Sequence, residues 1–125
     1  MPRSEMSQAG VILVVEDEPV LRFILVEELQ DAGYEVFAAV DAAQAIDILE
    51  SNFDIQLLLT DIDLFAEGEG VELARMVRDR WPPIRIILTS GNWTLQQSEL
   101  TFAERFIPKP HGPGVLLQTI RECML

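Results

Sequence analysis

The sequence predicts an α/β fold, in which a doubly wound, five-stranded parallel sheet carries helices on both faces. Two observations predict it. Short apolar runs alternate with segments of helical spacing from Gly10 onward, and continuously apolar runs are typical of strands that helices cover on both faces. The alternation also repeats about every 20 to 25 residues, which suits right-handed strand–helix–strand crossovers within one parallel sheet.

The expected strands cover residues 11–15, 35–39, 55–60, 84–89 and 105–108. A first helix is expected over residues 19–32, because Pro19 suits a first helical turn and Gly33 suits a helix stop. Asp41 is followed three residues later by Gln44. This capping signature starts a second helix, which is expected to end near residues 51–52.

Three further helices are expected in the second half of the chain. Apolar residues at helical spacing predict a third helix that follows a loop at residues 65–70 and ends before Pro82. Residues 92–101 have a weak apolar face and are the expected fourth helix. The apolar face of the last helix consists of Leu116, Ile120 and Met124.

Four of the five strands are followed or closed by residues with reactive or charged side chains, namely Glu16 and Asp17, Asp61, Thr89 and Lys109. The strand at residues 35–39 supplies none, so it is expected at an edge, and the strand order is expected to be 2-1-3-4-5. Open α/β sheets bind ligands at the carboxyl ends of their strands. We therefore expect these side chains to converge on one site.

Composition describes one compact, strongly acidic domain. The chain has 125 residues, with 21 acidic against 9 basic side chains and a formal charge of -12. A field of that sign repels nucleic acid and favours Mg²⁺ or a basic protein partner. We expect residues 1–9 to be a flexible tail and residues 10–125 to be the domain. No apolar run approaches the roughly 20 residues of a membrane span, and Cys123 is the only cysteine, so a cytoplasmic location is expected.

The carboxylates after the first and third strands predict a magnesium site. Carboxylates a few ångströms apart cannot all ionise without a counter-cation. Mg²⁺ is usually held by one or two carboxylates and several waters, so we expect Asp17 and Asp61 as direct ligands. Glu16 would act through water, and the backbone carbonyl of Asp63 would complete the shell. With the metal and Lys109 neutralising charge, Asp61 can attack a phosphoryl group and form an acyl phosphate.

Four motifs at the predicted strand ends resemble those of the receiver domains of two-component response regulators. In order they are Glu16-Asp17-Glu18-Pro19, Leu57-Leu58-Leu59-Thr60-Asp61, Leu88-Thr89-Ser90-Gly91 and Phe106-Ile107-Pro108-Lys109-Pro110. The resemblance covers nearly the whole chain, from about Val11 to Met124. It implies a flavodoxin-like, chemotaxis-receiver-like fold, which agrees with the strand order expected from the residues.

The resemblance implies that Asp61 accepts a phosphoryl group from the phosphohistidine of a sensor histidine kinase or a histidine phosphotransfer protein, with Mg²⁺ required. It further implies that the Thr89 hydroxyl turns toward the phosphoryl group and that Phe106 swings inward. The surface of the last two helices and the strand between them would then change and control a downstream protein, or form a homodimer. Such a chain is not a turnover enzyme, because it catalyses only its own phosphorylation and dephosphorylation.

The loop after Asp61 departs from the family pattern, with Phe65 where proline is common and with Glu67 and Glu69 adding negative charge. This loop motivates one alternative, a degenerate receiver that serves as an unphosphorylated interaction module. A second alternative is a haloacid-dehalogenase-type phosphatase, which also uses an Asp-x-Asp pair with Mg²⁺, as in Asp61-Ile62-Asp63. Those enzymes place the pair after their first strand and need a second domain or cap.

Overall fold

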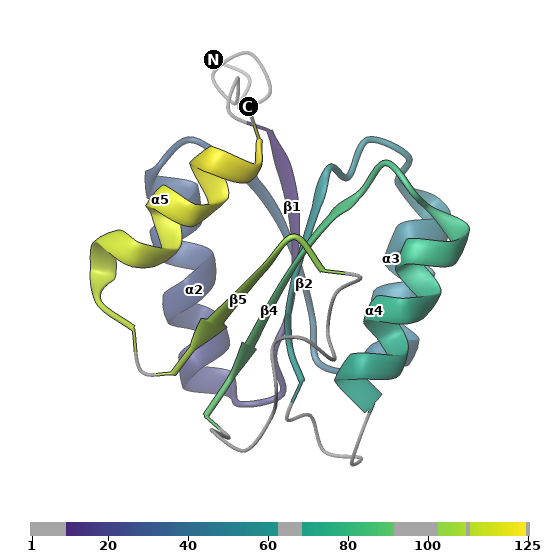
Figure 1. Ribbon diagram of the computed structural model, residues 1–125, viewed down its shortest axis with the longest axis horizontal. Helices are drawn as coiled ribbons and strands as arrows, with labels where there is room; N and C mark the ends of the chain where they lie inside the picture. Colours follow the sequence, from purple (N-terminus) through teal and green to yellow (C-terminus); the bar gives the residue numbers. More distant parts are fainter. Residues whose placement is uncertain (1–9, 63–68, 92–102, 110, 125) are drawn as a thin grey trace.

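The computed structural model describes residues 10–62, 69–91, 103–109 and 111–124 (Figure 1). Its centre is a five-stranded sheet in the order β2-β1-β3-β4-β5, and every neighbouring pair of strands is parallel. The strands are β1 Val11–Val15, β2 Glu35–Ala39, β3 Leu57–Asp61, β4 Arg85–Ser90 and β5 Arg105–Pro108. The predicted fold class and strand order are confirmed.

The described residues contain four helices, namely α2 Pro19–Asp31, α3 Ala42–Ser51, α4 Glu69–Arg80 and α5 Pro113–Cys123. Helices α2 and α5 cover one face of the sheet, and α3 and α4 cover the other (Figure 1). None of these described helices is long and apolar enough to cross a lipid bilayer. The expected tail at residues 1–9 and the expected helix at residues 92–101 lie outside the described residues.

Side chains that the sequence places at the helix starts fix the beginnings of α2 and α3. The Glu18 carboxylate accepts hydrogen bonds from the backbone N–H groups of Val20 and Leu21, at 3.3 and 2.6 Å. Asp41 accepts one from the N–H of Gln44 at 2.9 Å. Such caps satisfy backbone donors that a helix start leaves without partners. Both predicted helix starts are confirmed, and α2 begins directly after the turn that leaves β1.

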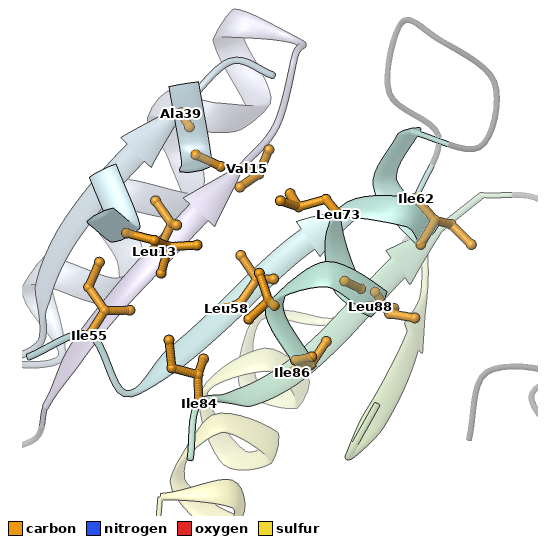
Figure 2. Packing of buried hydrophobic residues seen from close by; sticks show 14 residues of the cluster. Leu13, Val15, Ala39, Ile55, Leu58, Ile62, Leu73, Ile84, Ile86 and Leu88 are labelled. Carbon is orange, nitrogen blue, oxygen red and sulfur yellow. The ribbon is translucent and has the colours of Figure 1, made fainter. Parts of the chain in front are cut away.

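Successive strand residues face opposite helical layers, so the core consists of two apolar clusters. The cluster under α3 and α4 includes Leu13, Leu58, Leu73, Ile86 and Leu88 (Figure 2). The cluster under α2 and α5 includes Ile12, Leu25, Leu57, Ile87 and Leu116. Close packing on both faces holds the strands rigidly. The carboxyl ends of the strands are therefore a firm support for functional side chains.

Strand β5 lies at one edge of the sheet and is anchored where it begins. The Glu104 N–H donates to the Ile86 carbonyl oxygen at 2.9 Å, and the Glu104 carboxylate accepts from the Ile86 N–H at 2.6 Å. The same carboxylate forms an ion pair with Arg78 of α4. The next residue, Arg105, pairs with Glu122 of α5 at 3.0 Å. The start of β5 is thus tied to a helix on each face of the sheet.

The expected loop at residues 65–70 was wrong at its end, because Glu69 and Gly70 already belong to α4. Glycine is usually a loop signal, but here its missing side chain permits a close contact. A Cβ at Gly70 would lie 2.3 Å from the Asp61 carbonyl oxygen and 2.5 Å from the Ile62 Cα. Helix α4 can therefore begin directly against the end of β3.

Two strand boundaries also differ slightly from the expected ones. Strand β3 covers Leu57–Asp61 and not residues 55–60, and β4 covers Arg85–Ser90 and not residues 84–89. Ile84 donates its N–H to the Trp81 carbonyl oxygen at 2.9 Å, so it closes the turn that precedes β4. An apolar side chain in such a turn lengthens the apolar run in the sequence, although its residue does not pair with the neighbouring strand. The expected strand therefore began one residue too early.

We predict that Gly70→Ala lowers the free energy of unfolding by about 1 to 3 kcal/mol, the usual cost of overpacking a well-packed site. A helical Gly→Ala change without a clash stabilises by up to about 1 kcal/mol. Gly114→Ala in α5 is the matched control, because no atom lies within 4 Å of its added Cβ. Urea denaturation measures both variants, and equal effects would contradict the close approach of α4 to β3.

Candidate functional site

The predicted site residues meet at the carboxyl ends of the strands. Asp61 pairs with Thr89 in the register of β3 and β4. Glu16 directly follows β1, which is the other neighbour of β3. The N–H of Lys109 donates to the Ser90 carbonyl oxygen at 2.8 Å, which holds the chain leaving β5 against the end of β4. Four strands therefore contribute to one site, as the strand order predicts.

Glu16, Asp17 and Asp61 form a compact acidic cluster. Each residue offers a carboxylate oxygen, and these oxygens lie within 4.8 Å of one another. Glu16 and Asp61 are only 2% and 4% exposed, whereas Asp17 is partly exposed. Charges of one sign that are this close and this buried repel strongly, because little water screens them. The cluster therefore needs positive charge.

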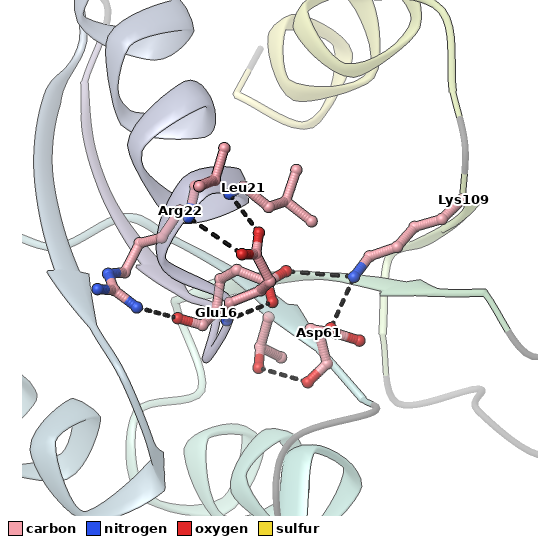
Figure 3. A network of polar contacts seen from close by, with 8 residues as sticks. Glu16, Leu21, Arg22, Asp61 and Lys109 are labelled. Atoms are coloured by element: carbon pink, nitrogen blue, oxygen red, sulfur yellow. Dashed lines mark hydrogen bonds and ion pairs between the residues drawn. The ribbon is translucent and has the colours of Figure 1, made fainter.

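Lys109 supplies one positive charge directly (Figure 3). Its Nζ lies 2.6 Å from Asp61 Oδ2 and 3.2 Å from Glu16 Oε1. The contact with Asp61 agrees with the predicted role of Lys109, and the direct ion pair with Glu16 was not anticipated. One ammonium against three carboxylates leaves a negative excess when all four groups are ionised.

Hydrogen bonds hold the turn from β1 into α2, which carries two of the three carboxylates. The Glu16 N–H donates to the Ala39 carbonyl oxygen at 3.1 Å. The Glu18 N–H donates to Glu16 Oε2 at 3.2 Å, and Arg22 Nη1 donates to the Glu16 carbonyl oxygen at 2.9 Å (Figure 3). Arg22 was not among the predicted site residues. Its signal in the sequence is a basic residue in the first turns of a helix that follows two acids.

The surroundings shift two titrations in the site. Burial raises the pKa of Glu16, and the nearby Asp61 charge raises it further, against the lowering effects of the Glu18 N–H and Lys109. Burial by itself would lower the pKa of Lys109, but the hydrogen bond and charge of Asp61, together with Glu16, outweigh burial and raise it. Lys109 is therefore held in its charged form, while the ionised form of Glu16 is disfavoured.

The residues present fit a magnesium ion. A hard divalent cation prefers carboxylate oxygens, and its two charges would offset the negative excess that Lys109 leaves. Glu16, Asp17 and Asp61 are the residues that would hold it. Asp63, whose backbone carbonyl was also a predicted ligand, lies outside the described residues.

Thr89 and Phe106, the two predicted switch residues, lie on the neighbouring strands β4 and β5. Thr89 is 6% exposed, and its carbonyl oxygen accepts a hydrogen bond from the Ile62 N–H at 2.9 Å. Phe106 is partly buried against the cluster under α3 and α4, and it pairs with Leu88 in the sheet register. These positions suit the predicted switch, and the movement itself stays a prediction.

We predict that the free energy of unfolding of Glu16→Gln increases, relative to that of the wild type, as pH rises. Because the folded-state pKa of Glu16 is raised above 4.5, the stability linked to this group is present below that pH and is lost as pH rises through the folded pKa. The glutamine variant lacks this loss. Urea midpoints in EDTA between about pH 4 and pH 8 measure the difference in stability between variant and wild type. Glu27→Gln, at an exposed position, is the control. A pH-independent difference between variant and wild type would contradict the raised pKa.

Known proteins resemble this chain in sequence. Residues 12–121 match the response regulator receiver domain. The chain is 37% identical over 117 residues to the aerobic respiration control protein ArcA of Escherichia coli (strain K12), which covers 91% of this chain and 47% of ArcA. It also matches the sensor kinase CckA of Brucella abortus (strain 2308) and the sensor protein TorS of Escherichia coli (strain K12), of which it spans 13% and 12% of the length. The chain thus spans less than half of these relatives.

Solved structures agree with the sequence match. A receiver domain protein (CheY-like) from Methanospirillum hungatei JF-1 has a TM-score of 0.84 and 30% identity, covering 92% of this chain and 93% of that chain. TrrA from Thermotoga maritima, solved in complex with Mg(2+)-BeF, has a TM-score of 0.82 and 28% identity, covering 91% of this chain and 98% of that chain. With the strand order and the sequence match, these likenesses show that the chain belongs to the receiver domain family of two-component response regulators.

Proposed function

We propose that this chain accepts a phosphoryl group on Asp61 from the phosphohistidine of a sensor histidine kinase or a histidine phosphotransfer protein, in a reaction that requires Mg²⁺. One observation carries the proposal. The buried Asp61 carboxylate lies 2.6 Å from Lys109 Nζ, beside the carboxylates of Glu16 and Asp17. A nucleophile, an ammonium and the ligands for a divalent cation thus lie together at the carboxyl ends of the strands. Phosphoryl transfer needs these three parts.

In the proposed step, a carboxylate oxygen of Asp61 attacks phosphorus and forms a P–O bond. The P–N bond of the phosphohistidine breaks, and its electron pair stays on the imidazole. Negative charge shifts to the phosphoryl oxygens during transfer, and a positioned cation lowers its energy in a site that water reaches poorly. The contact between Lys109 Nζ and Asp61 supports this role for Lys109. A bound Mg²⁺ would supply further neutralisation of the same oxygens.

Two findings support the metal requirement. The acidic cluster carries more negative charge than Lys109 offsets, and its donors are all carboxylate oxygens. TrrA, which shares the fold at a TM-score of 0.82, was solved in complex with Mg(2+)-BeF. Receiver domains are signalling domains and not turnover enzymes, so the proposed chemistry is limited to phosphorylation of Asp61 and its later hydrolysis.

The proposed output passes through β5. Thr89 lies beside Asp61 in the sheet, so its hydroxyl is near the incoming phosphoryl group, and Phe106 lies on the next strand. We propose that these two residues change position together and alter the surface formed by β5, α5 and the expected helix at residues 92–101. This surface would control a downstream protein or pair with a second copy of the chain. The acidic net charge of -12 opposes direct contact with nucleic acid, and the proposed location is the cytoplasm.

Helix α2 offers a docking patch for the protein that donates the phosphoryl group. Val20, Phe23 and Ile24 are 65%, 65% and 51% exposed, and all three lie on the half of α2 nearest the site. Contiguous apolar side chains on a surface mark protein interaction sites, and aromatic residues are enriched where such interfaces are fully buried.

A pocket beside this patch reaches Thr89 and Lys109, two residues that neighbour Asp61. The pocket has a volume of about 640 Å³, and its lining includes Leu21 and Leu25 of α2 together with Thr89 and Lys109. Lys109 also contacts Asp61, so a protein seated on the patch and in the pocket holds its phosphohistidine close to the acceptor. Positioning of this kind accounts for much of the rate of phosphoryl transfer.

We predict that Asp61→Asn abolishes phosphorylation and leaves the fold intact, because the amide keeps the shape of the carboxylate and removes the nucleophile. Intact-mass analysis after incubation with acetyl phosphate and Mg²⁺ should show one added phosphoryl group in the wild type and none in the variant or in EDTA. Asp79→Asn, at an exposed position on α4, is the matched control and should be phosphorylated like the wild type. A phosphoryl group on Asp61→Asn would overturn the acceptor assignment.

The same measurement decides the degenerate-receiver alternative. If the wild type gains no mass from acetyl phosphate or from any phosphohistidine protein, while calorimetry shows that Mg²⁺ binds, the chain is a phosphate-independent interaction module and the proposed function fails.

We predict that Phe23→Gln slows phosphotransfer from a phosphorylated protein about tenfold or more, which corresponds to the loss of about 1.4 kcal/mol or more of interface energy. The probe is a purified phosphohistidine protein that labels the wild type. Labelling by acetyl phosphate should be unchanged, since that donor needs no protein interface. Phe53→Gln is the control, because Phe53 is 88% exposed but lies outside α2. Equal effects of the two variants would remove α2 from the docking surface.

A further inference from the structure

Arg22 lies beside the acidic cluster, in the first turns of α2, and is partly buried. Its Nη1 donates a hydrogen bond to the Glu16 carbonyl oxygen at 2.9 Å, on the side of Glu16 away from Lys109 (Figure 3). Within the described parts of the chain, Arg22 forms no ion pair with a carboxylate. Its hydrogen bond goes to the backbone carbonyl of Glu16, a residue of the site. The role of Arg22 therefore lies in holding this carbonyl group.

The Glu16 carbonyl lies where the pairing of β1 with β2 ends. The Glu16 N–H still donates to Ala39, the last residue of β2. Strand β2 ends at Ala39, and the N–H of the next residue, Val40, donates to Gln44 Oε1 at 2.8 Å. A carbonyl in a buried position needs a hydrogen-bond donor, and Glu16 is 2% exposed. Arg22 supplies this donor, so a side chain takes over where the sheet stops.

A fixed carbonyl oxygen also fixes the direction of the next residue. The Glu16 carbonyl belongs to the peptide unit that leads to Asp17, and a peptide unit is planar. Holding its oxygen limits rotations that would turn Asp17 away from Asp61. The Glu16 side chain is held separately, because Oε1 accepts from Lys109 and Oε2 accepts from the Glu18 N–H.

We propose that Arg22 is a positioning residue of the magnesium site, whose hydrogen bond to the Glu16 carbonyl holds the Asp17 carboxylate toward those of Glu16 and Asp61. This inference rests on the proposed function, because it gives Arg22 a part in holding Mg²⁺. A purely electrostatic role has the opposite effect, since a guanidinium near the cluster repels a second cation. Removal of Arg22 weakens Mg²⁺ binding if Arg22 positions the ligands, and strengthens binding if only its charge acts.

The first test is Mg²⁺ binding by isothermal titration calorimetry. Arg22→Met retains much of the side-chain bulk but removes the donor and the charge, and we expect its Mg²⁺ affinity to fall about tenfold, as is usual when a partner behind the metal ligands is lost. Arg22→Lys keeps a donor and the charge and should restore part of the affinity. Arg121→Met, exposed on α5, controls for the loss of one positive charge and should bind like the wild type. Unchanged or tighter binding by Arg22→Met would overturn the inference.

A second measurement, made in EDTA, separates this inference from the proposed function. We expect Arg22→Met to shift the backbone amide resonances of Asp17 and Glu18 in ¹⁵N–¹H spectra, while those of α5 stay in place. Unmoved resonances would show that Arg22 does not position the turn, whatever the wild type does with Mg²⁺. If the resonances move but the wild type binds no Mg²⁺, the positioning of the turn is supported and the proposed function fails at its metal.

Discussion

Repulsion among three carboxylates at the carboxyl ends of the strands is the constraint on which the rest of this structure depends. Glu16 and Asp61 are almost fully buried, where water cannot screen them, and Lys109 reaches both. These charges come from three different strand ends, so they meet only when the strands are in the right order and register. A slip of one residue in any of those strands would turn its side chains to the opposite face. Fold and electrostatics therefore specify each other.

Packing and hydrogen bonds hold the elements around the acidic cluster. Two apolar clusters hold the strands from both faces, and Gly70 lets α4 pack against the end of β3, so the backbone of Asp61 has little freedom. Strand β5 is tied through Glu104 and Arg105 at its beginning. The chain that leaves the strand is held as well, because the Lys109 N–H donates to the Ser90 carbonyl oxygen and Lys109 Nζ pairs with Asp61 and Glu16. The backbone on both sides of Asp61 is therefore well supported.

Most of the fold was predictable because its signals are local and repeated. Apolar runs located all five strands, Pro19 and Asp41 located two helix starts, and reactive residues at strand ends located Asp61 and Lys109 in one site. Features that depend on distances between elements were not predictable. Gly70 reads as a loop residue unless the contact with Asp61 is known. The Lys109 pair with Glu16 and the reach of Arg22 depend on side-chain conformation, which no spacing along the chain encodes.

The edge position of β5 also bears on how copies of this chain behave toward one another. An edge strand presents backbone donors and acceptors that can recruit a strand of another molecule. Strand β5 extends only from Arg105 to Pro108. It begins with a guanidinium held by Glu122, and it ends in a residue that has no N–H to donate. The β5 edge is therefore a poor template for strand addition, so a second copy that docks on this side of the sheet must do so through side chains and not by extending the backbone ladder.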